Sequence, residues 1–190
     1  MERHRAAGEG SPPAGAPHDV IRPLASLEEL DRAGDVIGAQ MTPPFTHQDG
    51  RFGDLVRRFA EDRPLMLVVQ EVPPPAATRD RPVQGDPGGI VGGALAFRTG
   101  PRAVTLRMIG LAPRVRGRGL GRRLLAALEL AAVRLGATAI SLGADDGVKG
   151  FYSRQGYVGR GTALHKGLPL PGPFLEARLR KLAGTAEAPP

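Results

Sequence analysis

Cysteine is absent from this chain of 190 residues, so the protein can form neither disulfides nor thiolate metal sites. Histidine is nearly as scarce, and its copies lie far apart along the chain. The four histidines are at positions 4, 18, 47 and 165. Because this spacing does not match a metal-ligand pattern, we expect no metal ion in the protein.

Aromatic residues are also few. Trp is absent, and tyrosine occurs only at Tyr152 and Tyr157. Proteins that bind single-stranded nucleic acid stack bases on such rings. The scarcity therefore argues against this class of nucleic-acid-binding protein.

Long apolar runs are missing as well. The stretch Leu65–Val69 is far shorter than the roughly 20 residues that cross a bilayer. Residues 1–17 are charged and rich in Gly, Pro and Ala, without the apolar centre of a secretory signal. We expect a disordered tail at 1–17, no membrane segment and a cytoplasmic protein.

Positive charge is carried almost entirely by arginine, since lysine occurs only at positions 149, 166 and 181. The formal net charge is +7. The segment from Arg102 to Arg123 contains seven arginines and no acidic residue. Such a segment attracts an anion. A nucleic-acid-binding module is one interpretation, although no helix-turn-helix is evident.

Hydrophobic periodicity predicts a mixed α/β domain over residues 18–168. The predicted strands are 20–24, 65–72, 90–97, 103–111, 139–142 and one or two within 157–166. The predicted helices are 27 to about 40 (capped by Ser26), 52–61, 119–135 and 148–154. A long Pro-rich loop is expected at 73–87. We expect residues 169–190 to form a C-terminal extension with a short helix from Pro173 and a disordered end.

A basic, glycine-rich turn joins the predicted strand 103–111 to the long helix that follows. Its glycines let backbone N–H groups approach a ligand, and the start of the helix adds a positive dipole end. This combination suits a pyrophosphate. The turn ends Gly121-Arg122-Arg123, so it lacks the Gly-Lys-Ser/Thr of a P-loop. Its glycines, at 117, 119 and 121, also miss the Gly-x-Gly-x-x-Gly spacing of a dinucleotide fold.

Two patterns in the chain resemble a known family. Arg116, Gly119 and Gly121 match the Arg/Gln-x-x-Gly-x-Gly/Ala pattern of the GNAT acetyltransferase superfamily, and segment 109–113 is similar to the strand that precedes it. Segment 145–157, with aromatic residues at 151, 152 and 157, resembles the family's second signature. The resemblance covers roughly residues 20–168. It implies an α/β fold with a mixed, mostly antiparallel central sheet, flanking helices and splayed central strands.

The resemblance implies an N-acyltransferase that uses acetyl-CoA. Since cysteine is absent, the acceptor is expected to attack the bound donor directly. Tyr152 occupies the position of the general acid that protonates the departing thiolate. Asp145 stands where the family commonly has Asn. The residues implied to bind the cofactor are Ile109, Leu111, Arg116, Gly117, Arg118, Gly119, Leu120, Gly121, Arg122, Asp145 and Tyr152.

The general base is not evident from the sequence. The family often has a glutamate on the strand before the loop, but residues 104–108 contain no carboxylate. Glu71 and His47 are the candidates for this role. The expected acceptor is the primary amine of a small molecule, and a homodimer contact is one role for the C-terminal helix. Two alternatives stay open: a GNAT-like sensor that binds acyl-CoA without turnover, and the basic nucleic-acid-binding module.

Overall fold

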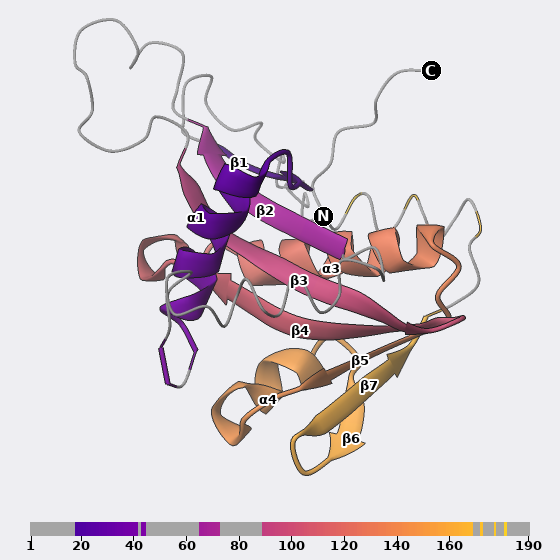
Figure 1. Ribbon diagram of the computed structural model, residues 1–190. Coiled ribbons are helices and arrows are strands. Elements are labelled where there is room, and N and C mark those ends of the chain that lie inside the picture. Colours follow the sequence, from indigo (N-terminus) through magenta and orange to yellow (C-terminus); the bar gives the residue numbers. More distant parts are fainter. Residues whose placement is uncertain are drawn as a thin grey trace, which may run out of the picture.

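A computed structural model of the protein describes residues 18–41, 43–44, 65–72 and 89–168, together with residues 172, 177 and 181. Its strands are β1 (His18–Pro23), β2 (Leu65–Val72), β3 (Ile90–Gly100), β4 (Ala103–Leu111), β5 (Ala139–Gly143), β6 (Val158–Arg160) and β7 (Ala163–Gly167). They form one seven-stranded sheet in the order β1-β2-β3-β4-β5-β7-β6 (Figure 1). All neighbours are antiparallel except β4 and β5, which are parallel. The predicted mixed, mostly antiparallel sheet is confirmed.

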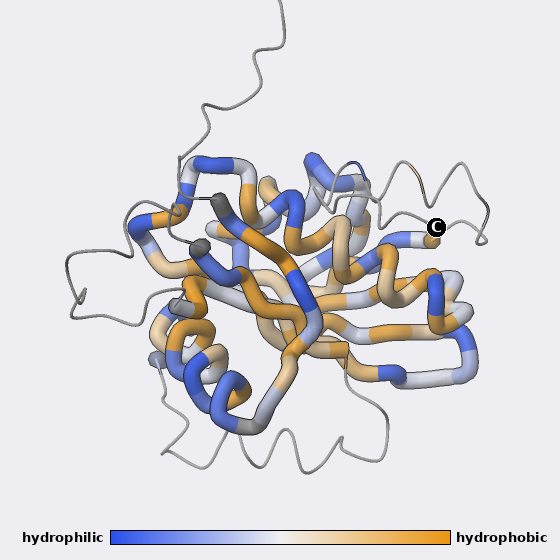
Figure 2. The backbone as a smooth tube through the Cα atoms, turned by 90° about the horizontal axis from the view of Figure 1, so that it is seen from above, coloured by the Kyte–Doolittle hydropathy of each residue, from blue (hydrophilic) through white to orange (hydrophobic). Residues whose placement is uncertain are grey.

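Helices cover both faces of this sheet. They are α1 (Leu27–Gly38), α3 (Leu120–Arg134) and α4 (Asp146–Ser153), with a 3₁₀ turn, η3, at Pro113–Val115. Figure 1 shows α1 in front of the sheet and α3 behind it. Along the backbone, hydrophobic stretches run through the strands, and hydrophilic residues alternate with hydrophobic ones along the helices (Figure 2). None of the helices in the described ranges is long and apolar enough to cross a membrane.

The long helix α3 packs through the leucine-rich face that the sequence predicts. Leu120, Leu124, Leu125 and Leu128 are all at most 1% exposed and belong to the larger hydrophobic cluster. Their spacing of three and four residues places them on one side of the helix. Because this face holds α3 against the sheet, the first turn of α3 is fixed in place beside the end of β4.

The start of α1 is fixed by a capping arrangement. The Ser26 hydroxyl accepts a hydrogen bond from the backbone N–H of Glu29 at 3.2 Å. The Glu29 carboxylate accepts from the Ala25 N–H at 2.8 Å and forms an ion pair with Arg22 of β1. The hydrogen bond from Arg22 lowers the pKa of Glu29 to about 2. These contacts tie α1 to β1 and thereby position the far end of the helix over β4.

A β-bulge interrupts β4. Leu95 of β3 pairs with Met108, and the next residue, Ala96, pairs with Leu106, so Arg107 is an extra residue in β4. A bulge reverses the alternation of side chains beyond it. Leu106 accordingly packs in the cluster under α3, whereas Met108, two residues later, packs in the cluster under α1.

Some element boundaries differ from the sequence predictions. Helix α4 begins at Asp146, two residues before the predicted 148, because Asp145 already takes the N-cap position with an extended backbone. The predicted terminal strand region forms two strands, and β7 is inserted between β5 and β6. Four predicted features lie wholly or almost wholly outside the described residues: the tail 1–17, the helix 52–61, the loop 73–87 and the helix from Pro173.

Candidate active site

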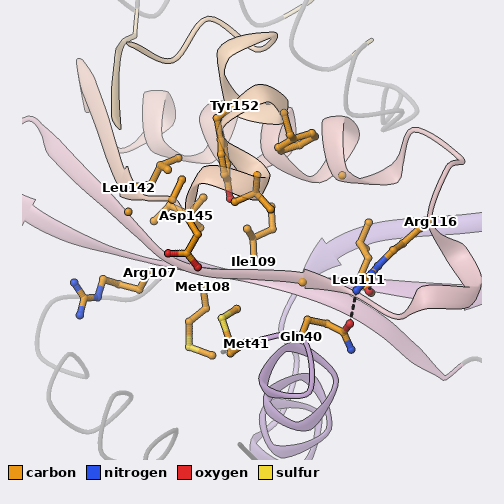
Figure 3. A pocket seen from close by; sticks show the side chains of 17 residues that line it. Gln40, Met41, Arg107, Met108, Ile109, Leu111, Arg116, Leu142, Asp145 and Tyr152 are labelled. Atoms are coloured by element: carbon orange, nitrogen blue, oxygen red, sulfur yellow. Dashed lines mark hydrogen bonds between the residues drawn. The ribbon is translucent and has the colours of Figure 1, made fainter. Parts of the chain in front are cut away.

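A pocket of about 560 Å³ lies between β4, β5, α4 and the end of α1 (Figure 3). Both polar and apolar side chains line it. The lining residues are Gln40, Met41, Leu106, Arg107, Met108, Ile109, Gly110, Leu111, Arg116, Gly121, Leu142, Gly143, Ala144, Asp145, Val148, Phe151 and Tyr152. The two signature segments of the sequence, around 116–121 and 145–152, therefore meet at one cavity.

The pocket exists because β4 and β5 separate. Their pairing ends at Leu106 and Leu142, whereas β4 continues to Leu111 and the chain after β5 turns into α4 at Asp146. Among the described residues, no strand lies beside β4 beyond this last pair on the side that faces β5. Unpaired strand edges present backbone N–H and C=O groups to a partner. This edge can therefore bind an extended, polar ligand, and the predicted splay of the central strands is confirmed.

The glycine-rich loop joins this edge to α3. Gly117 and Gly119 have φ angles of +78° and +74°, in the left-handed region that favours glycine. A Cβ atom at either position would meet no atom within 4 Å. Glycine is therefore favoured here by the backbone conformation and not by a lack of space. At Gly121 a Cβ would touch Phe151 at 3.5 Å, an ordinary contact, so alanine would fit there. Gly119 immediately precedes α3, whose first N–H groups have no partner within the helix.

Arg116 holds the loop to the rest of the pocket. Its Nε donates a hydrogen bond to the Leu111 carbonyl at 3.1 Å, and its Nη2 donates to the side-chain oxygen of Gln40 at the end of α1. Figure 3 shows this side chain bridging the end of β4 and α1. The motif arginine therefore stabilises the loop and also lines the pocket.

Other arginines of the segment anchor the loop to the neighbouring strands. Arg114 forms an ion pair with Glu71 of β2 at 3.1 Å, and Arg118 approaches the other oxygen of Glu71 at 3.7 Å. Arg123, in the first turn of α3, donates to the backbone carbonyl of Asp19 in β1 at 3.1 Å. Much of the positive charge that the sequence concentrates here thus fixes the loop against β1 and β2.

Tyr152 reaches the pocket from α4. Its ring is 6% exposed and makes edge-to-face contacts with Phe151 and Tyr157, with centroid distances of 5.0 and 5.8 Å. Burial raises the pKa of its hydroxyl, so the group stays protonated at neutral pH. No residue of the described part of the chain forms a hydrogen bond with this hydroxyl, which points toward β4 in Figure 3. The group is therefore a free proton donor at the cavity.

Asp145 contributes a carboxylate to the same cavity. The residue is exposed and precedes α4 in the N-cap position, yet its side chain makes no capping hydrogen bond. In Figure 3 its carboxylate extends toward β4, on the same side of the strand as Tyr152. Met41 and Met108 lie on the opposite side of the strand. Among the described residues, no group of three or more acidic or histidine side chains could hold a metal ion.

Comparison with family models decides the class of protein. Residues 77–159 match the model of the acetyltransferase (GNAT) domain. The matched segment is similar to a GNAT acetyltransferase domain. Both sequence signatures lie within the matched range, so the resemblance drawn from them is confirmed. No curated protein matches the sequence closely enough to count as a relative.

Solved structures share the fold of this GNAT domain. A GNAT-family acetyltransferase from Staphylococcus aureus Mu50 superposes with a TM-score of 0.60 at 13% identity, covering 80% of this chain and 100% of its own. A GNAT-family acetyltransferase from Brucella melitensis, in complex with acetyl-CoA, gives 0.57 at 18%, covering 82% and 92%. An aminoglycoside 6'-N-acetyltransferase complexed with coenzyme A gives 0.60 at 15%, covering 80% and 99%. At these identities the comparison establishes the fold.

The residues that the sequence assigned to the GNAT site fall into three groups. Those that line the pocket are Ile109, Leu111, Arg116, Gly121, Asp145 and Tyr152. Those in the adjoining loop and the start of α3, outside the lining, are Gly117, Arg118, Gly119, Leu120 and Arg122. Leu120 is buried in the core, so only its backbone is available to a ligand. Of the two candidate bases, Glu71 does not line the pocket and forms ion pairs with loop arginines. His47 lies outside the described residues.

Several lining residues were not predicted from the sequence. Gln40 and Met41 come from the end of α1, and Arg107 and Met108 flank the bulge of β4. No local pattern marks the bulge, because it depends on pairing with β3. Phe151 could have been predicted as a lining residue, since it lies next to Tyr152 in the second signature.

Proposed function

We propose that this GNAT domain transfers an acetyl group from acetyl-CoA to the primary amine of a small molecule. The main support for the proposal comes from the surroundings of the Tyr152 hydroxyl. It is protonated, has no hydrogen-bond partner among the described residues and faces a cavity between two separated strands. A glycine loop suited to a pyrophosphate adjoins the same cavity.

The residues present fit acetyl-CoA, which supplies an activated thioester when bound. The loop from Gly117 to Arg122 offers backbone N–H groups and the start of α3 to the pyrophosphate. The free edge of β4 beyond Leu106 offers backbone groups to the extended arm of the cofactor. The complexes of the Brucella melitensis protein with acetyl-CoA and of the aminoglycoside acetyltransferase with coenzyme A support this choice of donor.

The chain's own groups supply the remaining chemistry. Backbone N–H groups on the β4 edge stabilise the negative charge that develops on the acyl oxygen. Tyr152 gives its proton to the departing sulfur, and its raised pKa keeps the hydroxyl protonated before this step. The absence of cysteine means that the amine attacks the donor without an S-acyl enzyme.

The lining of the pocket supports a small molecule as the acceptor. Met41 and Met108 present apolar, flexible side chains toward α1, which accommodate ligands of varied shape. The alternative of a nucleic-acid-binding module is less well supported, because Arg114, Arg116 and Arg118 are engaged in contacts within the protein. These contacts reduce the positive charge that the segment can offer to a polyanion.

A free-thiol assay with acetyl-CoA and a panel of amines tests the proposal. Kanamycin, spermidine, L-lysine and a short peptide with a free amino terminus represent the main classes of acceptor. We expect amine-dependent release of thiol with at least one of them. Saturable binding of acetyl-CoA without any thiol release would instead favour the sensor that binds acyl-CoA without turnover.

A further inference from the structure

We infer that Asp145 is the general base that accepts the proton of the acceptor amine. This inference rests on the proposed function and names the group that the sequence leaves unassigned. Asp145 lines the pocket together with Tyr152, so a proton acceptor and a proton donor share one cavity.

The local geometry leaves the Asp145 carboxylate available. Asp145 occupies the N-cap of α4 with φ −71° and ψ 159°, the backbone conformation in which an aspartate ordinarily accepts from an N–H of the first turn. Here it makes no such hydrogen bond. Within the described ranges it also forms no ion pair. Figure 3 shows the carboxylate turned away from its helix and toward β4.

The other acidic side chains near the site are engaged elsewhere. Glu71 is held by two loop arginines outside the pocket lining. Asp146 forms an ion pair with Lys149 on the same helix and does not line the pocket. Glu129 is buried in the core with Tyr157 and Lys166. Among the described acidic residues, Asp145 alone lines the cavity.

The charge of the pocket gives this carboxylate a second role. The charged and titratable side chains that line it are Arg107 from β4, Arg116 from the loop, and Asp145 and Tyr152 from the α4 segment. Two guanidinium groups repel an ammonium ion that approaches the cavity. Asp145 supplies the only negative charge in the described lining, so it attracts the acceptor to the position where the acceptor must lose a proton.

The proton transfers balance over one turnover. An N–H bond of the ammonium group breaks, and its proton goes to a carboxylate oxygen of Asp145. The free amine forms a bond to the acyl carbon of the acyl-CoA thioester, the C–S bond breaks, and the Tyr152 hydroxyl protonates the sulfur. The second proton of the nitrogen returns to Tyr152 through water. Asp145 then releases its proton to solvent, so one proton is released in each cycle.

Asp145→Asn tests the inference with little change in shape, and Asp146→Asn is the matched control one residue away. We expect Asp145→Asn to lower kcat by about 10²- to 10⁴-fold, the usual contribution of a general base. Its affinity for acetyl-CoA, measured by calorimetry, should stay unchanged. Its residual rate should rise with pH, since only amine that is already neutral in solution can react. Asp145→Glu should restore part of the activity, and Asp146→Asn should behave like the wild type.

The outcomes separate this inference from the proposed function. If Asp145→Asn keeps the wild-type kcat and pH profile, Asp145 is not the base. If the variant loses acetyl-CoA affinity but keeps kcat at saturation, Asp145 is a contact to the donor and the inference is overturned. If the wild-type protein acetylates none of the four probe amines, the proposed function itself fails, and the role of Asp145 fails with it.

Discussion

Tyr152 and Tyr157 are neighbours in the core, 5.8 Å apart between ring centres, yet their hydroxyl groups have different surroundings. The Tyr157 hydroxyl donates to the buried Glu129 carboxylate at 3.1 Å. The Lys166 ammonium lies 2.8 Å from both oxygens of that carboxylate and 5.4 Å from the centre of the Tyr157 ring. The Tyr152 hydroxyl has no partner in the described part of the chain and faces the pocket.

The difference shows how one residue type serves two purposes. A buried hydroxyl that is hydrogen-bonded stabilises the fold, because leaving its partner unsatisfied would cost free energy. The Tyr152 hydroxyl makes no such stabilising contact among the described residues and faces the pocket, where it is available to a ligand. We therefore propose a structural role for Tyr157 and a catalytic role for Tyr152, and substitutions in each region can separate the two roles.

The largest effect is expected from Tyr152→Phe. Removing a general acid lowers turnover by about 10²- to 10⁴-fold, whereas acetyl-CoA affinity and the unfolding midpoint should change little. Steady-state kinetics together with calorimetry measure both quantities. Wild-type turnover in this variant would mean that solvent or another group protonates the thiolate. Tyr152 would then not be the general acid.

Glu129→Leu should have the next largest effect, on stability. Removing the carboxylate leaves the half-buried Lys166 ammonium without its counter-ion, and breaking such a pair costs about 3 kcal/mol of unfolding free energy. Urea denaturation measures this loss. The double variant with Lys166→Met should recover much of it, since both charges are then gone. A single variant as stable as the wild type would contradict the structural role of the cluster.

Tyr157→Phe should have a smaller effect of the same kind. The Glu129 carboxylate loses one of its hydrogen-bond donors but keeps Lys166, so we expect a loss of about 1 kcal/mol. Turnover measured under conditions where the variant is folded should stay close to the wild-type value. A drop in turnover as large as that of Tyr152→Phe would show that the cluster takes part in the chemistry.

The smallest effect concerns pH. Burial and the Glu129 carboxylate raise the pKa of Tyr157 far above its ordinary value of about 10. Since the folded pKa lies above the unfolded one, the stabilisation is fully present below about pH 10 and is lost as the pH rises further. The stability advantage of the wild type over Tyr157→Phe should therefore stay constant up to about pH 9 and shrink as the pH rises from about 10 to about 11. A constant difference across this range would contradict the raised pKa.

The sequence predicts the glycine-rich loop and the helix start after it because the signals for them are local. The positions of Gly117 and Gly119, the helix start after them and the tyrosine of the second signature all lie in short segments. The strand separation follows from the family resemblance, and the structure confirms it through the last pair, Leu106 with Leu142. Local backbone requirements are readable without knowledge of distant contacts.

The pocket residues from α1 and from the bulge of β4 depend on contacts between distant segments, so the sequence does not reveal them. The bulge at Arg107 arises from its register with β3, and Met41 reaches the pocket only because α1 packs over β4. Glu71 was named as a candidate base because residues 104–108 contain no carboxylate. Its ion pairs with Arg114 and Arg118, more than forty residues away, could not be seen in the sequence. Asp145 was assigned only to cofactor binding, because the family resemblance places it where the family commonly has Asn.

Titration calorimetry with acetyl-CoA tests the central claim most directly, with ATP and NADPH as competing anions at the same salt concentration. Gly119→Val is the informative variant, because a β-branched residue cannot adopt φ +74° without strain. Gly136→Val is its control, with a similar φ of +80°, open space around it and a position outside the pocket lining. We predict selective, saturable binding of acetyl-CoA by the wild type and Gly136→Val, and its loss in Gly119→Val. No binding by the wild type, or equal binding of all three ligands, would contradict the account.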